Sequence, residues 1–501
     1  MSDKNLDKHQ SLQQVINHRL EKLNNIKSAG INPYPHNFDV KNKIKDLIAL
    51  DDKYTENVFT AGRIVSMRKM GKAAFCHIQD GGNKIQLYLK DSLLEENQYD
   101  NIVRNLDIGD IVGITGNLFF TKTKELSIRC ISITILSKSI RPLPNIKEKD
   151  GELFFSFEDK ELRYRNRHLD LLINNRTKET FKQRASLISS IRDYLNKKDF
   201  LEVETPVLQS IYGGANARPF TTFHNTLEEE FFLRISLELY LKRLIIGGVN
   251  KVYELSKNFR NEGMDKDHNP EFTMLEFYSA YSDVYDMLDL TENMIKSVFL
   301  DNLDESFYEY NNNKIFLEND FVKIDFFDSI SKYSGTDVSK FNDIELKEFL
   351  KKSEIRIEKD SNYGNLIDKV FSHFVEPNLV QPTFVLNFPK EISPLAKSHR
   401  DNEKLVERFE LFIGGMEIAN SFTELNDPID QLERLKNQSS LRDEGDLEAQ
   451  PIDNGFIEAM EVGMPPTGGV GIGIDRLTML LTNNTSIKDV ILFPAMRTAN
   501  E

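Results

Sequence analysis

Gly469-Val-Gly-Ile-Gly-Ile-Asp-Arg476 is the stretch that decides the fold. Its glycines alternate with larger aliphatic residues, so it predicts a strand with one apolar face and one bare face. A bare face lets a ligand approach the backbone closely. Asp475 and Arg476 then open a helical run, and a helix N-terminus beside an arginine favours a phosphate group. The stretch predicts a phosphate site; a glycine-rich strand beneath a packed helix is the alternative.

Two common nucleotide-binding motifs do not fit the sequence. Gly71-Lys72 would need a glycine at position 66 to form a P-loop, and Ser66 stands there. Residues 468–476 cannot be spaced as the glycine pattern of a dinucleotide-binding fold. The phosphate site must therefore belong to another kind of fold.

A second segment complements the glycine-rich strand. Residues 252–255 predict a strand that leads into Phe259-Arg-Asn-Glu262, and residues 271–278 predict the returning strand. Alternation places Arg260 and Glu262 on one face. On the returning strand, one face is expected to carry Phe272, Glu276 and Tyr278.

A separate small β domain is predicted upstream. Strands are expected at 58–67, 73–79, 84–90, 111–119 and 125–136, which fits a five-stranded barrel of the OB type. Its outward faces carry Phe75, His77, Gln86 and Tyr88. Aromatic rings can stack on single-stranded bases, and amides can recognise base edges. An ordinary solvated sheet face is an equally good interpretation of these residues alone.

Residues 254–278 resemble motif 2 of the class II aminoacyl-tRNA synthetases, and residues 469–476 resemble motif 3. Phe200-Leu-Glu-Val-Glu-Thr-Pro206 resembles motif 1, and the three occur in the family's order. The resemblance implies an α+β fold, in which an antiparallel-sheet catalytic domain flanked by helices follows the barrel. It also implies a homodimer whose interface includes motif 1.

The amino acid is suggested by a further resemblance. A barrel before the catalytic domain is similar to the aspartyl, asparaginyl and lysyl enzymes. Lysine requires carboxylates aimed at a remote ammonium, whereas aspartate and asparagine require donors. Residues 409–426, 213–220 and 268–273 closely resemble the lysyl subgroup. The resemblance implies attachment of L-lysine to tRNA(Lys) through a lysyl-adenylate. The alternatives are an aspartyl- or asparaginyl-type enzyme, a non-catalytic RNA-binding paralogue, and a paralogue that lysylates a protein.

The resemblance assigns site residues position by position. Lysine would be bound by Gly214, Glu238, Glu276, Tyr278, Asn420, Phe422 and Glu424. ATP would be bound by Arg260, Glu262, His268, Asn269, Phe272, Glu410 and Arg476, and the two arginines would be catalytic. Mg²⁺ would be held by Glu410 and Glu417. The anticodon would be recognised by Arg68, Phe75, Gln86 and Glu125.

One geometric difficulty and two departures accompany this assignment. Strict alternation sends Asn420, Phe422 and Glu424 to the face opposite Glu417, so we expect a bulge between 417 and 420. Where the lysyl subgroup usually has Ala-Pro before its glutamate, this chain has Ser236-Leu237. Where the subgroup usually has Thr-Ala-Gly, this chain has Thr467-Gly468-Gly469.

The expected organisation covers the chain in three parts: an amphipathic helix and lead-in at 1–54, the barrel at 55–145, and the catalytic domain at 146–501. Further helices are expected at 176–198 and 283–300, and strands at 251–260, 407–413, 416–424 and 467–474. Residues 301–380 are interpreted as an inserted helical segment.

Composition limits the class of protein. A net charge of −15 argues against non-specific coating of nucleic acid. Two distant cysteines exclude a disulfide scaffold and a four-cysteine zinc site. The absence of an 18-residue apolar run predicts no membrane span, and the polar N-terminus predicts a cytoplasmic protein.

Overall fold

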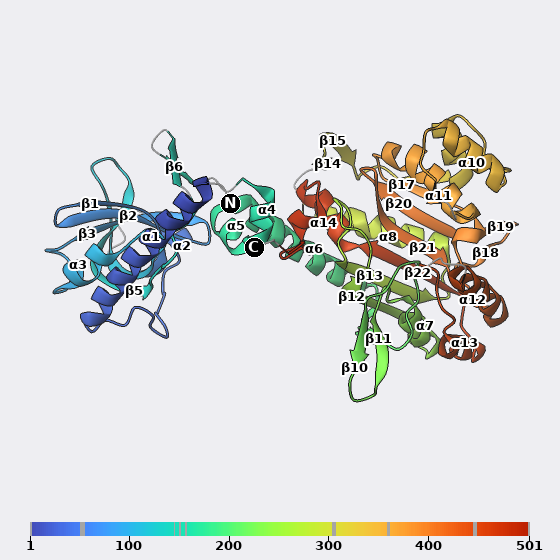
Figure 1. Cartoon of the computed structure of the whole chain (residues 1–501), viewed down its shortest axis with the longest axis horizontal. Helices are drawn as coiled ribbons and strands as arrows, with labels where there is room; N and C mark the ends of the chain where they lie inside the picture. Colours follow the sequence, from blue (N-terminus) through green and yellow to red (C-terminus); the bar gives the residue numbers. More distant parts are fainter. Residues whose placement is uncertain are drawn as a thin grey trace. The chain divides into compact units, whose positions relative to one another are not determined.

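The structure is a computed structural model that describes residues 3–50, 56–144, 146–149, 152–155, 158–302, 307–357, 361–443 and 448–498. The chain forms two compact units, Met1–Asn175 and Arg176–Glu501 (Figure 1). The expected α+β fold, with a barrel and a helix-flanked sheet, is confirmed. In the described part of the chain, no helix combines the length and apolarity that crossing a membrane requires.

The first unit is a closed five-stranded barrel in the order β1-β2-β3-β5-β4. All five predicted strands are confirmed: β1 (Val58–Met70), β2 (Ala73–Asp80), β3 (Asn83–Lys90), β4 (Ile111–Phe120) and β5 (Leu126–Ser137). The residues that alternate with the outward ones on β2 and β3 are buried in its core: Cys76, Ile78, Ile85, Leu87 and Leu89.

The amphipathic helix packs on the barrel. Helix α1 (Asp3–Ser28) places Ile26 in the barrel core, and the Arg19 guanidinium donates to the carbonyls of Ile108, Ser139 and Arg141. Leu20 of the same helix is exposed. The unit also contains α2 (Ile44–Ile48), α3 (Gln98–Asn101), η1 (Val103–Asn105), β6 (Ile146–Lys149), β7 (Glu152–Phe155), α4 (Lys160–Arg165) and α5 (Arg167–Ile173).

The second unit is built on an eight-stranded sheet in the order β16-β17-β20-β21-β22-β13-β12-β8. Its strands are β8 (Leu201–Glu202), β12 (Lys251–Phe259), β13 (Glu271–Ala280), β16 (Val322–Asp325), β17 (Thr383–Leu386), β20 (Arg408–Ile413), β21 (Met416–Thr423) and β22 (Thr467–Gly473). The six strands from β17 to β12 are mutually antiparallel, and β16 and β8 pair in parallel at the edges.

Three helices bury the apolar face of this sheet. They are α6 (Asn175–Lys197), α8 (Val284–Leu300) and α14 (Ile474–Thr482), and their side chains share one core with Val470 and Ile472 of the glycine-rich strand. The bare face of β22 is therefore left for the opposite side of the sheet, as the alternation predicts.

The remaining elements frame the other side and the ends. They are β9 (Leu208–Gln209), β10 (Thr221–His224), β11 (Glu229–Leu233), α7 (Glu238–Ile246), η2 (Glu376–Asn378), η3 (Lys390–Ile392), β18 (Ser398–His399), β19 (Asn402–Val406), α12 (Pro428–Asp443), α13 (Asn454–Glu461) and α15 (Ile487–Val490). The β10–β11 hairpin extends away from the body of the second unit (Figure 1).

The interpretation of 301–380 as purely helical is wrong at its start. Helices α9 (Phe326–Ser334), α10 (Asp343–Lys352) and α11 (Tyr363–Phe374) follow a hairpin of β14 (Phe307–Tyr310) and β15 (Asn313–Phe316), and then β16. Asn311 and Asn312 have φ of 49° and 65°, which two-residue hairpin turns require. The Asn-Asn pair was the overlooked turn signal.

Candidate active site

The β20–β21 hairpin contains the predicted bulge. Glu410 pairs with Asn420 and Leu411 with Ala419, but Phe412 pairs with Glu417, so Ile418 is the extra residue. This one-residue shift brings Glu417 and Asn420 into the lining of one cavity, together with Glu424 beyond the strand end.

Strand β22 provides the floor of that cavity. A Cβ at Gly469 would overlap Oε1 of Glu424 and the ring of Tyr278, and a Cβ at Gly471 would come within 2.7 Å of Met274 Cε. At Gly473 the nearest side-chain atom, Arg476 Cδ, is at 3.8 Å, which is ordinary contact. The bare face is thus most crowded at its Gly469 end.

The same strand explains one departure from the lysyl pattern. A Cβ at Gly468 would approach Met287 Cγ to 2.6 Å and the Asp283 carbonyl oxygen to 2.9 Å. An alanine there would force the start of α8 to move, so glycine is the residue that fits this packing.

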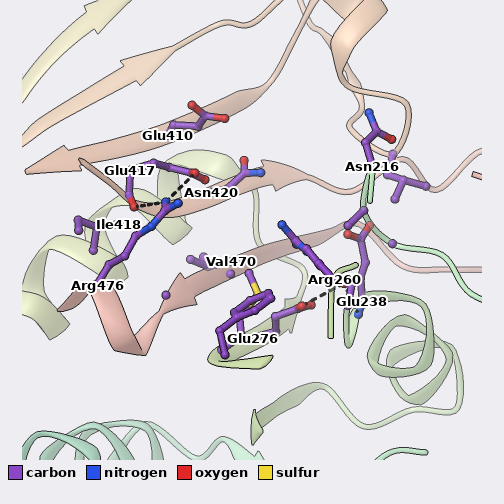
Figure 2. A pocket seen from close by; sticks show the side chains of 18 of the residues that line it. Asn216, Glu238, Arg260, Glu276, Glu410, Glu417, Ile418, Asn420, Val470 and Arg476 are labelled. Atoms are coloured by element: carbon purple, nitrogen blue, oxygen red, sulfur yellow. Dashed lines mark hydrogen bonds and ion pairs between the residues drawn. The ribbon is translucent and has the colours of Figure 1, made fainter. Parts of the chain in front are cut away.

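The cavity has a volume of about 400 Å³ and lies above the bare strand. Figure 2 shows side chains from the hairpin, from β22 and α14, and from the α7 side converging on it. The structure brings together here every residue predicted to contact lysine, ATP or Mg²⁺: Gly214, Glu238, Arg260, Glu262, His268, Asn269, Phe272, Glu276, Tyr278, Glu410, Glu417, Asn420, Phe422, Glu424 and Arg476.

One end of the cavity carries the two arginines. Arg476 points toward Glu417 and donates to its carboxylate at 3.1 Å and to its carbonyl at 2.7 Å (Figure 2). A second Arg476 nitrogen lies 3.1 Å from Nε2 of His268. The Arg260 guanidinium lies 5.2 Å from the Phe272 ring centroid, and burial lowers the pKa of this arginine. Partly buried cations in a concave site favour an anionic ligand.

The other end carries three buried carboxylates, from Glu238, Glu276 and Glu424. Burial, and then the Glu238 charge, raise the pKa of Glu276 to about 7. Tyr278 donates to Glu276 Oε2 at 2.9 Å. Oε1 of Glu424 is buried and has no hydrogen-bond partner among the described residues. Such a group is costly unless a ligand cation satisfies it.

The Ser236-Leu237 departure supports this acidic end directly. The Ser236 hydroxyl and the Leu237 backbone N–H both donate to Glu276 Oε1 at 3.0 Å. The usual Ala-Pro pair could supply neither donor, because alanine lacks a hydroxyl and proline lacks an N–H. This chain therefore holds Glu276 with two additional hydrogen bonds.

The outward face of the barrel in the first unit forms a second candidate site. His77 Nε2 and Gln86 Nε2 each lie 2.7 Å from a different Glu125 oxygen. The Phe75 and Tyr88 rings lie 4.9 Å apart. Arg68 pairs opposite Phe75 across β1 and β2 and is exposed. The four predicted anticodon residues thus share one face.

Comparison with known proteins decides the family. Residues 159–497 match the family of tRNA synthetases class II (D, K and N). The chain belongs to this family. Residues 58–136 match the OB-fold nucleic acid binding domain. A lysine–tRNA ligase from Porphyromonas gingivalis is 45% identical over 497 residues, which covers 97% of this chain and 86% of the relative.

Two side chains of this class II synthetase that contact the expected site residues were not predicted. Arg408 donates to Glu410 Oε1 at 2.5 Å and to Asn420 Oδ1 at 3.0 Å. Lys242 lies between Glu238 and Glu424. Both had a local signal: Arg408 is two residues from Glu410 on one strand face, and Lys242 is one helical turn from Glu238.

A metal can be accommodated beside the hairpin of the synthetase. Burial raises the pKa of Glu410 to about 8; Arg408 opposes this effect, while Glu417, Asp368 and Glu376 add to it. A cation would relieve this accumulation of negative charge. No cluster of three or more metal-ligating side chains occurs among the residues described. Two carboxylates fit Mg²⁺, which is commonly held by one or two carboxylates and substrate phosphates.

Proposed function

We propose that this chain attaches L-lysine to tRNA(Lys) in two ATP-dependent steps. The observation that carries the proposal is the acidic end of the cavity, where three carboxylates are buried. Lysine has two ammonium groups to neutralise them. Aspartate or asparagine would leave buried carboxylates facing a polar or negative side chain, which is strongly unfavourable.

Lysine would lie along the cavity with its carboxylate toward Arg260. Glu424 and Tyr278 would bind the ε-ammonium, and Glu238, Glu276 and the Gly214 carbonyl would surround the α-ammonium. Asn420 would face the carboxylate, and Phe422 would form a wall of the pocket. The unpartnered Glu424 Oε1 supports the placement of an ammonium at this end.

ATP would occupy the arginine end. Phe272 would stack on the adenine, and Glu262, His268, Asn269 and Glu410 would contact the nucleotide. The lysine carboxylate attacks the α-phosphorus, the bond to the β-phosphate oxygen breaks, and pyrophosphate leaves. Arg260 would stabilise charge at the α-phosphate, and Arg476 at the γ-phosphate. The attacking carboxylate is already ionised, so positioning replaces a general base.

Glu410 and Glu417 would hold Mg²⁺, which neutralises phosphate charge when bound. Their carboxylates pair with Arg408 and Arg476 respectively. The two arginines therefore hold both carboxylates in defined orientations.

The second step transfers the lysyl group from the adenylate to a hydroxyl of the terminal adenosine of tRNA, and AMP leaves. Arg68, Phe75, Gln86 and Glu125 on the barrel would recognise the anticodon, with Phe75 stacking on a base. The Glu125 network would hold Gln86 in one orientation toward a base edge. Charging of tRNA implies a cytoplasmic location.

A homodimer is supported by the surface around motif 1. Leu201, Val207, Leu208, Ile211 and Phe223 are exposed apolar side chains of the second unit. Adjacent exposed apolar residues are typical of protein interfaces. We propose that this surface meets the same surface of a second copy.

Pyrophosphate exchange and tRNA charging test the proposal. The exchange of pyrophosphate into ATP should depend on lysine. Exchange that depends on aspartate or asparagine instead would refute the lysyl assignment. Charging of tRNA(Lys) separates the proposal from a non-catalytic paralogue and from a protein-lysylating one. Glu424→Gln should raise the lysine KM about 100-fold, the usual scale for breaking a buried charge contact.

A further inference from the structure

Helix α7 carries a lysine whose side chain lies inside the protein and not at its surface. Lys242 is fully buried, and its Nζ lies 2.5 Å from Glu238 Oε1 and also pairs with Glu424 Oε2. The ammonium lies 5.4 Å from the Phe422 ring centroid. The chain thus places one of its own ammonium groups between two carboxylates that are proposed to bind substrate ammonium groups.

Lys242 does not line the cavity, although both of its partners do. It stands behind the carboxylates and leaves Glu424 Oε1 without a hydrogen-bond partner among the described residues. A buried lysine costs free energy unless it is paired, and both partners of Lys242 are carboxylates that line the cavity.

The charges at this end of the cavity indicate what the lysine does. Three carboxylates and one ammonium leave two negative charges, which equal the two ammonium groups of lysine. Arg260 is the counterpart of the single substrate carboxylate. Burial raises the pKa of Glu238 and Glu424, and Lys242 opposes this rise, so loss of Lys242 would favour their protonated forms further.

We propose that Lys242 is a positioning residue for lysine specificity: it fixes Glu238 and Glu424 as ionised, oriented carboxylates and sets the charge of the pocket to that of a diammonium ligand. The charged and titratable groups around it are Glu238 of its own helix, Glu276 and Tyr278 of β13, Arg408 of β20 and Glu424 after β21. This inference rests on the proposed binding of lysine to the pocket.

The test is Lys242→Met in the full chain, measured by lysine-dependent pyrophosphate exchange between pH 6 and 9. The lysine KM should rise about 30-fold or more, the usual scale for removing one partner of a buried charge pair. The ATP KM should change less than about threefold, and the pH at which the lysine KM becomes lowest should move upward. Lys242→Arg keeps the charge and should restore the pH profile.

Helix α8 offers a matched control. Lys296 pairs with Glu292 one helical turn before it at 2.7 Å, and lies 5.3 Å from the Phe321 ring centroid. Neither residue lines the cavity. Lys296→Met removes the same kind of contact and should leave the lysine KM and its pH profile unchanged.

Three outcomes overturn the inference: an unchanged lysine KM in Lys242→Met, equal rises in the KM for lysine and ATP, or an unrestored pH profile in Lys242→Arg.

If Lys242→Met does not fold, calorimetry of lysine binding to the unaltered protein decides. In buffers of different ionisation enthalpy near pH 6.5, release of at most one proton supports the inference, because Glu238 and Glu424 would then bind lysine without both having to lose a proton. Release of two or more overturns it. Absence of any lysine-dependent exchange in the unaltered protein would instead refute the proposed function.

Discussion

The active-site cavity and the outward face of the barrel are both polar sides of sheets, but they differ in burial. In the cavity, Glu238, Glu276 and Glu424 are almost completely removed from solvent. On the barrel, the His77 and Glu125 side chains that bond to each other keep 33% and 45% of their exposure. The first surface therefore acts through desolvated charge, and the second through stacking and solvated hydrogen bonds.

This difference governs how each surface discriminates between ligands. In a low-dielectric cavity, one misplaced charge costs several kcal/mol. On an exposed face, each aromatic contact contributes about 1–3 kcal/mol, and water competes for the polar groups. We therefore expect amino-acid selection to depend on a few indispensable atoms and anticodon recognition to be distributed over the face.

The largest effect should come from Arg260, which is half-buried in the cavity at the boundary between the two proposed substrates. Arg260→Gln should lower kcat/KM for pyrophosphate exchange about 10³-fold, the upper range for removing one preorganised donor to developing charge. Arg192→Gln is the control, because Arg192 forms a half-exposed ion pair with Glu202 and is not part of the cavity lining. A loss below tenfold would contradict the assignment.

The next effect contrasts two glycines on the same bare strand. Gly469→Ala should raise the lysine KM about 100-fold, because the new methyl group would displace Glu424 and Tyr278. Gly473→Ala introduces only ordinary contacts with Arg476 and should change the lysine KM less than threefold. Exchange kinetics with varied lysine check both values. Similar rises in the lysine KM at the two positions would contradict this prediction. They would show that any substitution on the strand impairs binding, and not specifically crowding at the acidic end.

The strands and the side chains on their faces could be predicted from the sequence. The barrel strands and the residues of motifs 2 and 3 lie at regular period-2 positions, so alternation located them. The bulge at Ile418 was predictable because strict alternation and one shared site were incompatible. The first inference uses only neighbours along the chain, and the second adds the shared site that the family resemblance implies.

Pairings between distant segments were not predictable. The meeting of Lys242 with Glu424 depends on where α7 lies over the sheet, and no local pattern specifies that. The donation of Leu237 N–H to Glu276 depends on the same packing. The hairpin at 307–316 was missed for a different reason, since its Asn-Asn turn was outweighed by the charged composition around it.

A smaller effect should follow the removal of the two hydrogen bonds that Ser236 and Leu237 donate to Glu276. Both lower the pKa of Glu276, which burial has raised to about 7, so Ser236→Ala combined with Leu237→Pro should raise it further. Lysine binding requires the ionised form, so affinity should increase with pH up to about 7 in the unaltered protein and only at higher pH in the variant. If the pKa of Glu276 rises by about one, lysine binding should weaken about tenfold at acidic pH and stay nearly unchanged above both pKa values.

Calorimetric titration with lysine at pH 6 and pH 9 checks this result. The variant resembles the usual family pattern, so we expect it to fold. Ser282→Ala is the control, because Ser282 donates to Ser279 and is not part of the cavity lining. A variant whose affinity falls equally at both pH values would indicate displacement of the helix and not a change in the ionisation of Glu276.

The smallest effect should lie on the barrel. Phe75→Ala should raise the tRNA(Lys) KM about five- to tenfold, because one stacking surface is lost while Tyr88, 4.9 Å away, remains. Lysine-dependent exchange without tRNA should not change, since Phe75 belongs to the first unit and the cavity to the second. Phe120→Ala removes another exposed ring of the barrel, one that is absent from the Phe75–Tyr88 stack, and should leave the tRNA KM unchanged. If Phe75→Ala reduces charging more than Gly469→Ala does, recognition on the exposed face is not distributed, and the contrast between the two surfaces fails.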